Sequence, residues 1–107
     1  MPVKIVSHHG ILFDGAVLDA FSRENGIARL SLFGSVLRED FGTESDVDVL
    51  VEFLPEERVG FLRLMRIERE LAALLGVRKV DLRTPEDLSP FFRERVLSEA
   101  EDLYVRG

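Results

Sequence analysis

Two aspartates separated by one residue open an apolar segment near the middle of the chain. Asp46 and Asp48 begin the run Asp-Val-Asp-Val-Leu-Val-Glu-Phe over residues 46–53. Successive side chains of a β-strand point to opposite faces, so both aspartates would share the face opposite the valines. The valines suit a core, whereas folding does not require two carboxylates at a strand end. An Asp-x-Asp pair by itself is most often a solvated strand end, so chemistry is indicated only if further groups join it.

A third aspartate has an equivalent place in a later apolar segment. Asp81 lies in the expected strand 77–82, on the face opposite that strand's apolar residues. If this strand lies beside the strand 46–53, the three carboxylates converge, and like charges at that separation repel one another strongly. Divalent cations relieve such repulsion, and carboxylate oxygens on rigid strands suit Mg²⁺ or Mn²⁺ together with substrate phosphates. The sequence therefore predicts a metal site at Asp46, Asp48 and Asp81.

A glycine–serine pair precedes the first two aspartates. Gly34 and Ser35 follow the expected strand 28–33 and begin an expected helical segment, 36–40. Glycine lets a backbone approach a ligand closely, and the free amides at a helix start, with a serine hydroxyl, can hold a phosphate. Alone, the pair is typical of a tight turn with a helix cap. Together with the acids, it predicts one element for a polyphosphate and another for the metal ions that bridge it.

These motifs resemble those of a known superfamily. Segments 32–35, 46–51 and 79–82 are similar to the nucleotidyltransferases related to DNA polymerase β, and closest to their MNT-type branch, the minimal nucleotidyltransferase antitoxins. The resemblance extends over nearly the whole chain, including residues 88–104, which are similar to the closing helix of that branch. It implies a polymerase β-like fold formed by residues 1–107 as a single domain.

The resemblance also implies an activity and residue roles. The reaction would be a two-metal transfer of a nucleoside monophosphate, AMP from ATP, to a hydroxyl, with release of pyrophosphate. Asp46 and Asp48 match the acids that hold both Mg²⁺ ions, and Asp81 matches the acid that shares one ion and helps deprotonate the acceptor. Gly34 and Ser35 match the pair that grips the β- and γ-phosphates. In this branch the acceptor is a tyrosine of a partner HEPN-domain toxin, so the implied role is that of an antitoxin.

The residues after the glycine–serine pair follow the family pattern in part. Arg38 keeps a basic position, which suggests a phosphate contact, with an exposed helix charge as an equal alternative. Glu39 stands where relatives often carry glycine, so the local backbone can differ from theirs.

Composition limits the classes of partner. The chain has 107 residues, 46% of them apolar and 32% charged, which is ordinary for one globular domain. A net charge of −6 argues against strong binding to nucleic acid or to anionic membranes. The absence of cysteine excludes thiolate metal sites and fits a cytoplasmic protein, and no apolar run approaches the ~18 residues of a membrane span. We therefore expect ATP and a toxin as partners, and leave open whether the chain forms a homo-oligomer.

The remaining patterns complete an α/β (α+β) expectation. A loose lead-in over 1–10 precedes three further helices, 14–24, 61–75 and 90–104, which alternate with the three strands. This order predicts a mixed sheet of three to four strands covered by about four helices, with the strand order open. Other candidate residues are expected to be structural: solvated His8 and His9, a solvated helix face with Arg63, Arg66 and Arg69, and core or dimer packing for Phe91, Phe92 and Tyr104.

Two rival functions use the same features. A non-catalytic nucleotide-binding module could neutralise a partner toxin by stoichiometric binding, although retention of all three acids favours an enzyme. Transfer to a small molecule or an RNA end is less favoured, because such enzymes usually carry an added acceptor-binding domain and the chain is acidic.

Overall fold

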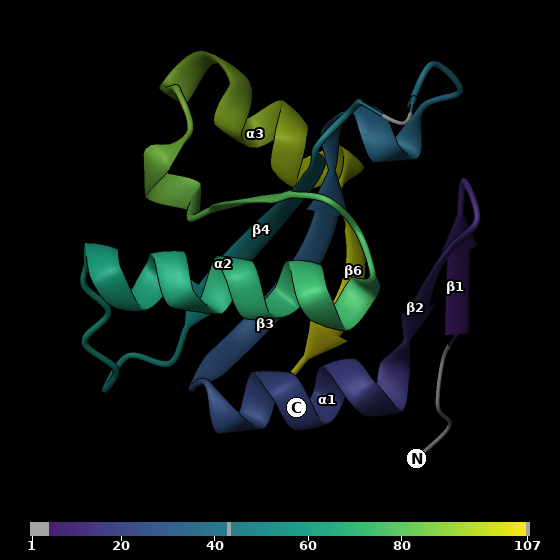
Figure 1. Cartoon of the computed structure of the whole chain (residues 1–107). Coiled ribbons are helices and arrows are strands. Elements are labelled where there is room, and N and C mark those ends of the chain that lie inside the picture. The colour runs from purple at the N-terminus through teal and green to yellow at the C-terminus, as the bar shows by residue number, and fades with distance from the viewer. Residues whose placement is uncertain (1–4, 43, 107) are drawn as a thin grey trace.

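Strands and helices alternate along the part of the chain described by the computed structural model, residues 5–42 and 44–106 (Figure 1). The strands are β1 (Ile5–His8), β2 (Ile11–Asp14), β3 (Ile27–Phe33), β4 (Val47–Phe53), β5 (Val80–Arg83) and β6 (Glu101–Val105). The helices are α1 (Gly15–Glu24), α2 (Phe61–Leu75) and α3 (Pro90–Glu99), with two short 3₁₀ turns, η1 (Gly34–Leu37) and η2 (Pro85–Asp87).

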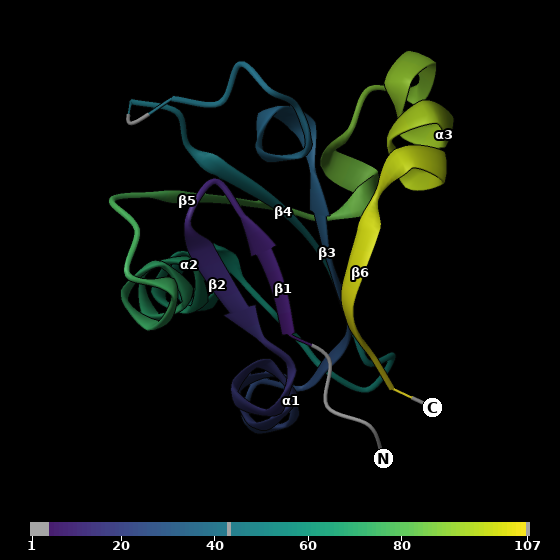
Figure 2. The same ribbon diagram turned by 90° about the vertical axis from the view of Figure 1, so that its right-hand side faces the viewer.

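A mixed sheet of four strands, in the order β5-β4-β3-β6, organises these elements. Strand β3 is antiparallel to β4 and to β6, whereas β4 and β5 are parallel, connected through α2. Helices α1 and α2 lie on one side of the sheet, while η1 and α3 lie together at one end of it (Figures 1 and 2). The expected α/β architecture with a mixed sheet of three to four strands is confirmed. The described helices differ from expectation, being three α-helices and two 3₁₀ turns.

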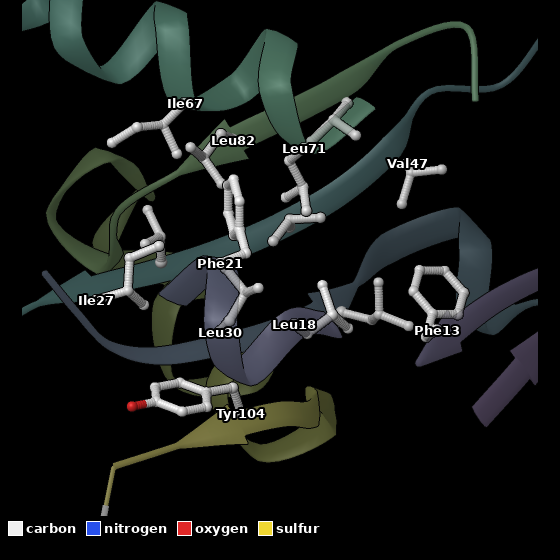
Figure 3. Close-up of a cluster of buried hydrophobic side chains, with 14 of the residues drawn as sticks. Phe13, Leu18, Phe21, Ile27, Leu30, Val47, Ile67, Leu71, Leu82 and Tyr104 are labelled. Atoms are coloured by element: carbon white, nitrogen blue, oxygen red, sulfur yellow. The ribbon is translucent and has the colours of Figure 1, made fainter. Parts of the chain in front are cut away.

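The core fills the space between the sheet and the two helices α1 and α2. Leu30 and Leu32 of β3 stand opposite Val51 and Val49 of β4, and all four side chains are fully buried. Figure 3 shows Leu30 within this cluster of buried apolar side chains. Each such side chain contributes roughly 1.5–3 kcal/mol by leaving water. Because the apolar face of β4 supplies its core contacts, the opposite face, which carries Asp48, is not needed for packing.

Helix α2 covers this core with one stripe. Ile67 and Leu71, one turn apart, are fully buried, while Arg66 and Glu70, which directly precede them, are exposed and pair with each other at 3.9 Å. The helix ends at Gly76, whose φ of 70° is the left-handed conformation in which glycine is favoured. No helix in the described part of the chain is long and apolar enough to cross a membrane.

The segment before α1 is a β-hairpin and not the expected loose lead-in, although residues 1–4 of that segment lie outside the described part. His9 and Gly10 both have positive φ, 53° and 79°, as the tightest hairpin turns require. The hairpin is fixed to the rest of the fold by Phe13, which is buried in the core. His8 departs from the expected solvation, because it is partly buried and its Nε2 lies 2.9 Å from Glu101 Oε2. His9 is exposed as expected, and its ring stacks on that of Phe41 with the ring centroids 4.9 Å apart.

The last helix is shorter than expected, because the chain turns into strand β6 after Glu99. Pairing with β3 is reinforced by Asp102, which accepts a hydrogen bond of 2.7 Å from the Ser31 hydroxyl and two from the Arg29 guanidinium. Tyr104 is buried as expected, at 6% exposure. Residues 101–104 therefore lie in an edge strand and not in the expected helix. The hydrogen bonds that hold this strand cannot be predicted from the local sequence.

Two phenylalanines of α3, expected to pack in the core or in a dimer, are not in the core. Phe91 is 91% exposed and Phe92 is 61% exposed. The arginines of α2 also divide: Arg66 lies on the solvated face, whereas Arg63 donates to the Asn25 carbonyl and to Glu57 Oε1, the latter at 2.7 Å. Arg63 therefore anchors the start of α2 to the segment after α1.

Candidate active site

The register between β4 and β5 brings two of the three predicted acids side by side. Asp48 stands directly opposite Asp81 in the parallel pair, so both side chains lie on the same face of the sheet. Asp46 stands just before β4, two residues from Asp48, and like Asp48 it is partly exposed, whereas Val47 between them is buried. The condition on which the predicted cluster depended, that these two strands are neighbours, is met.

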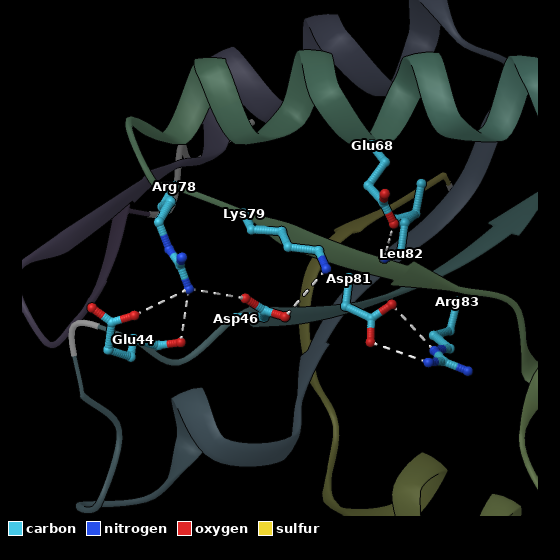
Figure 4. A network of polar contacts seen from close by, with 8 residues as sticks. All are labelled: Glu44, Asp46, Glu68, Arg78, Lys79, Asp81, Leu82 and Arg83. Atoms are coloured by element: carbon cyan, nitrogen blue, oxygen red, sulfur yellow. Dashed lines mark hydrogen bonds and ion pairs between the residues drawn. The ribbon is translucent and has the colours of Figure 1, made fainter.

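Helix α2 helps to hold Asp81 in place from the outer edge of the sheet. β5 is an edge strand, and its Leu82 amide donates to Glu68 Oε2 of α2 at 2.8 Å (Figure 4). The capped edge cannot readily pair with another strand. The same bond hinders β5 from sliding along β4, and so it helps to keep Asp81 in register with Asp48.

Gly34 closes the other side of the cluster. Phe33 is the register partner of Asp48 in β3, and the chain turns immediately afterwards at Gly34, with φ of +75°. A Cβ at this position would collide with Asp48 Oδ2 and lie 3.2 Å from its Cγ. The backbone of the next residue, Ser35, lowers the pKa of Asp48 and so favours its charged form. The predicted phosphate-binding pair and the predicted metal-binding pair are therefore in direct contact.

The electrostatics of this contact concentrate on Asp48, which is half-buried. Burial is the main cause that raises its pKa above the ordinary value, followed by the negative charges of Asp81 and Asp46. Arg83 and the Ser35 backbone act in the opposite direction without cancelling this rise. The negative charge of Asp48 is therefore not balanced within the site, and a bound cation would balance it.

Basic side chains form ion pairs with Asp46 and Asp81, the two acids on either side of Asp48. Asp81 accepts hydrogen bonds of 3.2 and 3.3 Å from Arg83, and Asp46 lies 3.7 Å from Lys79 Nζ and 3.9 Å from Arg78 (Figure 4). Within the described residues, no three histidine, cysteine or acidic side chains are grouped tightly enough to form a metal-binding set.

The donor chemistry nevertheless fits a hard divalent cation. All three side chains offer carboxylate oxygens, and Asp48 is destabilised by its like-charged neighbours, which a cation would reverse. The basic side chains that stand in this place are largely exposed, and exposed ion pairs of this kind contribute at most about 1 kcal/mol. Cation binding would therefore require Lys79 and Arg83 to turn away, at small cost.

Arg38 lies at the edge of the site. The expected helical segment 36–40 is shorter and tighter, ending as η1 at Leu37, so Arg38 and Glu39 are exposed residues beyond it. The Arg38 guanidinium is 3.7 Å from Asp40 and lines a pocket that begins at Gly34. It is thus near the predicted phosphate site but not inside the acid cluster.

Sequence reasoning missed the charges that surround these residues. Arg83 lies two residues after Asp81 on the same strand, a spacing that would have placed both on one face. Arg95 and Phe92 of α3 line the pocket at Gly34, and no local spacing relates them to it.

Comparison with known proteins places this geometry in a family. A family described as the nucleotidyltransferase domain matches residues 16–103. Protein adenylyltransferase MntA of Thermococcus cleftensis is 39% identical over 74 residues, which cover 69% of this chain and 72% of that protein.

Solved structures share the fold. A toxin–antitoxin complex crystallised with AMP-PNP aligns over 86% of this chain and 73% of that chain, with a TM-score of 0.67 and 20% identity. A tri-AMPylated Shewanella oneidensis HEPN toxin in complex with an MNT antitoxin contains a chain that aligns with a TM-score of 0.61 and 20% identity, over 86% of this chain and 70% of that one. The chain therefore belongs to the nucleotidyltransferase domain family, and within it to the branch of minimal nucleotidyltransferases related to the protein adenylyltransferases.

Proposed function

We propose that this chain is a Mg²⁺-dependent protein adenylyltransferase that moves AMP from ATP to a hydroxyl of a HEPN-domain toxin and thereby acts as its antitoxin. The observation that carries this proposal is the contact of Gly34 with Asp48, which in turn stands in register with Asp81. The adenylyltransferase name of the Thermococcus relative and the AMPylated toxin in the Shewanella complex support this proposal. We assign the activity to residues 1–107 as one domain, working in the cytoplasm where ATP and Mg²⁺ are present.

Each site residue has a role in this reaction. Asp46, Asp48 and Asp81 would hold two Mg²⁺ ions, or Mn²⁺ in their place. The chemistry that these ions supply when bound is activation of the attacking oxygen and stabilisation of the leaving one. Gly34 and the Ser35 hydroxyl would bind the β- and γ-phosphates, because glycine lets the backbone approach a phosphate closely.

The covalent step is a substitution at the α-phosphorus. The acceptor oxygen forms a bond to the α-phosphorus, and the bond from that phosphorus to the oxygen bridging it to the β-phosphate breaks. Pyrophosphate leaves with the electron pair of that bond, and Asp81 takes the proton of the acceptor hydroxyl. Correct positioning of the two reacting groups supplies much of the rate enhancement. The register that sets Asp48 opposite Asp81 would hold the two carboxylates in the positions that this requires.

The ion pairs at the outer acids suggest how the site responds to its substrate. Arg83 and Lys79 now balance Asp81 and Asp46. When cations take over these carboxylates, the freed basic groups would be close to the phosphates of the nucleotide. This exchange keeps the net charge of the site near balance in both states.

The experiment uses ATP labelled at the α-phosphate, Mg²⁺ and a HEPN-domain toxin encoded in the same genome. Transfer of label to the toxin supports the proposal, and Asp48→Asn should abolish it. Glu44→Gln is the control for loss of one acidic charge, because Glu44 is an exposed acid that pairs with Arg78 and lies outside the cluster. A tight complex that forms without any label on the toxin would instead establish the alternative, a nucleotide-binding module that neutralises the toxin by binding alone.

A further inference from the structure

A pocket of about 350 Å³ opens beside Gly34, between η1 and helix α3. Figures 1 and 2 show these two elements at the same end of the sheet. Its described lining includes none of the three aspartates, so it extends from Gly34 away from the acid cluster. The lining residues are Phe33, Gly34, Arg38, Phe92, Arg95, Val96 and Glu99.

Two guanidinium groups give this pocket a surplus of positive charge. Arg38 and Arg95 line it together with one carboxylate, Glu99. Each arginine has a carboxylate partner, Asp40 at 3.7 Å and Glu99 at 3.2 Å respectively, but the pairs are exposed to water. Exposed pairs are weak and are readily exchanged for a ligand of higher charge. The acidic chain therefore presents a local site for an anion.

The walls favour a phosphate over a solvated counterion. Phe33 of β3 and Phe92 of α3 both line the pocket, so a ligand in it loses part of its contact with water. Electrostatic attraction strengthens as water is excluded. The planar fork of arginine also matches two phosphate oxygens at once, which a point charge cannot do.

The order of groups identifies which phosphate this is, on the basis of the proposed function. The α-phosphorus must lie at the aspartates, where the bond is broken, and the β- and γ-phosphates follow along Gly34 and Ser35. The γ-phosphate is the outer of the two, so it lies where Gly34 opens into the pocket. We propose that α3 is the second wall of the triphosphate site and that Arg95, with Arg38, binds the terminal phosphate of ATP and the pyrophosphate that leaves.

Glu99 provides a test of the opposite sign. Its carboxylate lines the same pocket and holds Arg95 at 3.2 Å, so it opposes an entering anion in two ways. Removing its charge should strengthen the binding of pyrophosphate, while removing the charge of Arg95 should weaken it.

Calorimetric titration of the full chain with Mg²⁺-pyrophosphate, ATP and AMP tests the assignment. Arg95→Gln should weaken the binding of pyrophosphate and of ATP about tenfold, which is the lower range for loss of a charge-assisted hydrogen bond. The affinity for AMP should not change. Glu99→Gln should increase the affinity for pyrophosphate severalfold. Arg66→Gln is the matched control, because Arg66 pairs with Glu70 one turn along α2 in the same exposed arrangement, and it should change nothing.

The outcomes separate the two proposals. If the unmodified protein binds pyrophosphate and Arg95→Gln binds it equally well, the assignment of α3 is wrong while the proposed function stands. An equal loss of AMP and pyrophosphate affinity in Arg95→Gln would likewise overturn it, because the effect would not be specific to the distal phosphates. If the unmodified protein binds neither ATP nor pyrophosphate, the proposed function itself fails, and this inference with it.

Discussion

Replacement of Gly34 by alanine isolates the contact on which the proposed site depends. The backbone at Gly34 has φ of +75°, and the added methyl group would collide with the Asp48 carboxylate. Gly76 offers a matched control, since its φ of +70° is nearly the same and nothing lies within 4 Å of the added atom. The two substitutions therefore share their backbone strain and differ in the displacement of one carboxylate.

The magnitudes follow from these two effects. A left-handed alanine costs roughly 1–2 kcal/mol, partly offset by the lower entropy of the unfolded chain. Both variants should thus lose about 1 kcal/mol of stability, which lowers the melting temperature by about 4–8 °C for a domain of this size. Displacing a catalytic group by about 1 Å can cost about 100-fold in rate. Gly34→Ala should lose that much adenylyl transfer, whereas Gly76→Ala should keep it.

Thermal unfolding and transfer of α-labelled AMP to the toxin measure the two effects separately. Comparable melting temperatures with activity lost only in Gly34→Ala would support the argument. Full activity in a folded Gly34→Ala protein would falsify it, because the close approach to Asp48 would then have no functional consequence.

Three further predictions address charge, metal and core. Asp48→Asn should raise the melting temperature at neutral pH while abolishing transfer, because it removes a half-buried charge that is repelled by Asp81 and Asp46; unfolding and transfer assays on one preparation check both signs. Mg²⁺ should raise the melting temperature of the unmodified protein, an effect that EDTA reverses and that Asp48→Asn largely loses, since a ligand of the folded state stabilises it. Leu71→Ala should cost about 2–5 kcal/mol in urea unfolding, because the side chain is fully buried against the sheet; a loss below about 1 kcal/mol would contradict the packing described for α2.

Local periodicity was sufficient for much of this fold. The alternation of valine and aspartate placed the core and the acids on opposite faces of β4, and the structure agrees: Val47 and Val49 are buried and Asp48 is not. The stripe of α2 and its stop at Gly76 were also predictable, because helix periodicity and the left-handed end are properties of consecutive residues.

Errors arose where distant segments compete with local preference. Residues 101–104 belong to the helix expected over 90–104, yet they lie in β6, because β3 offers backbone hydrogen bonds and Asp102 accepts hydrogen bonds from Ser31 and Arg29. The β1–β2 hairpin was missed for a related reason: its strands have four residues each, and Phe13 anchors them in a core built by other elements. Strand preference is set largely by such neighbours.

The sequence by itself determined the identity of the chemical groups and the face that each would take, because alternation along a strand needs no knowledge of the rest of the chain. It thereby named Gly34, Ser35 and the three aspartates. Only the tertiary structure decided that β5 lies beside β4, which sets Asp48 against Asp81, and that α3 folds back to bring Arg95 to the pocket at Gly34. These contacts join residues far apart in the chain, and their formation depends on packing and backbone hydrogen bonds that no single segment contains.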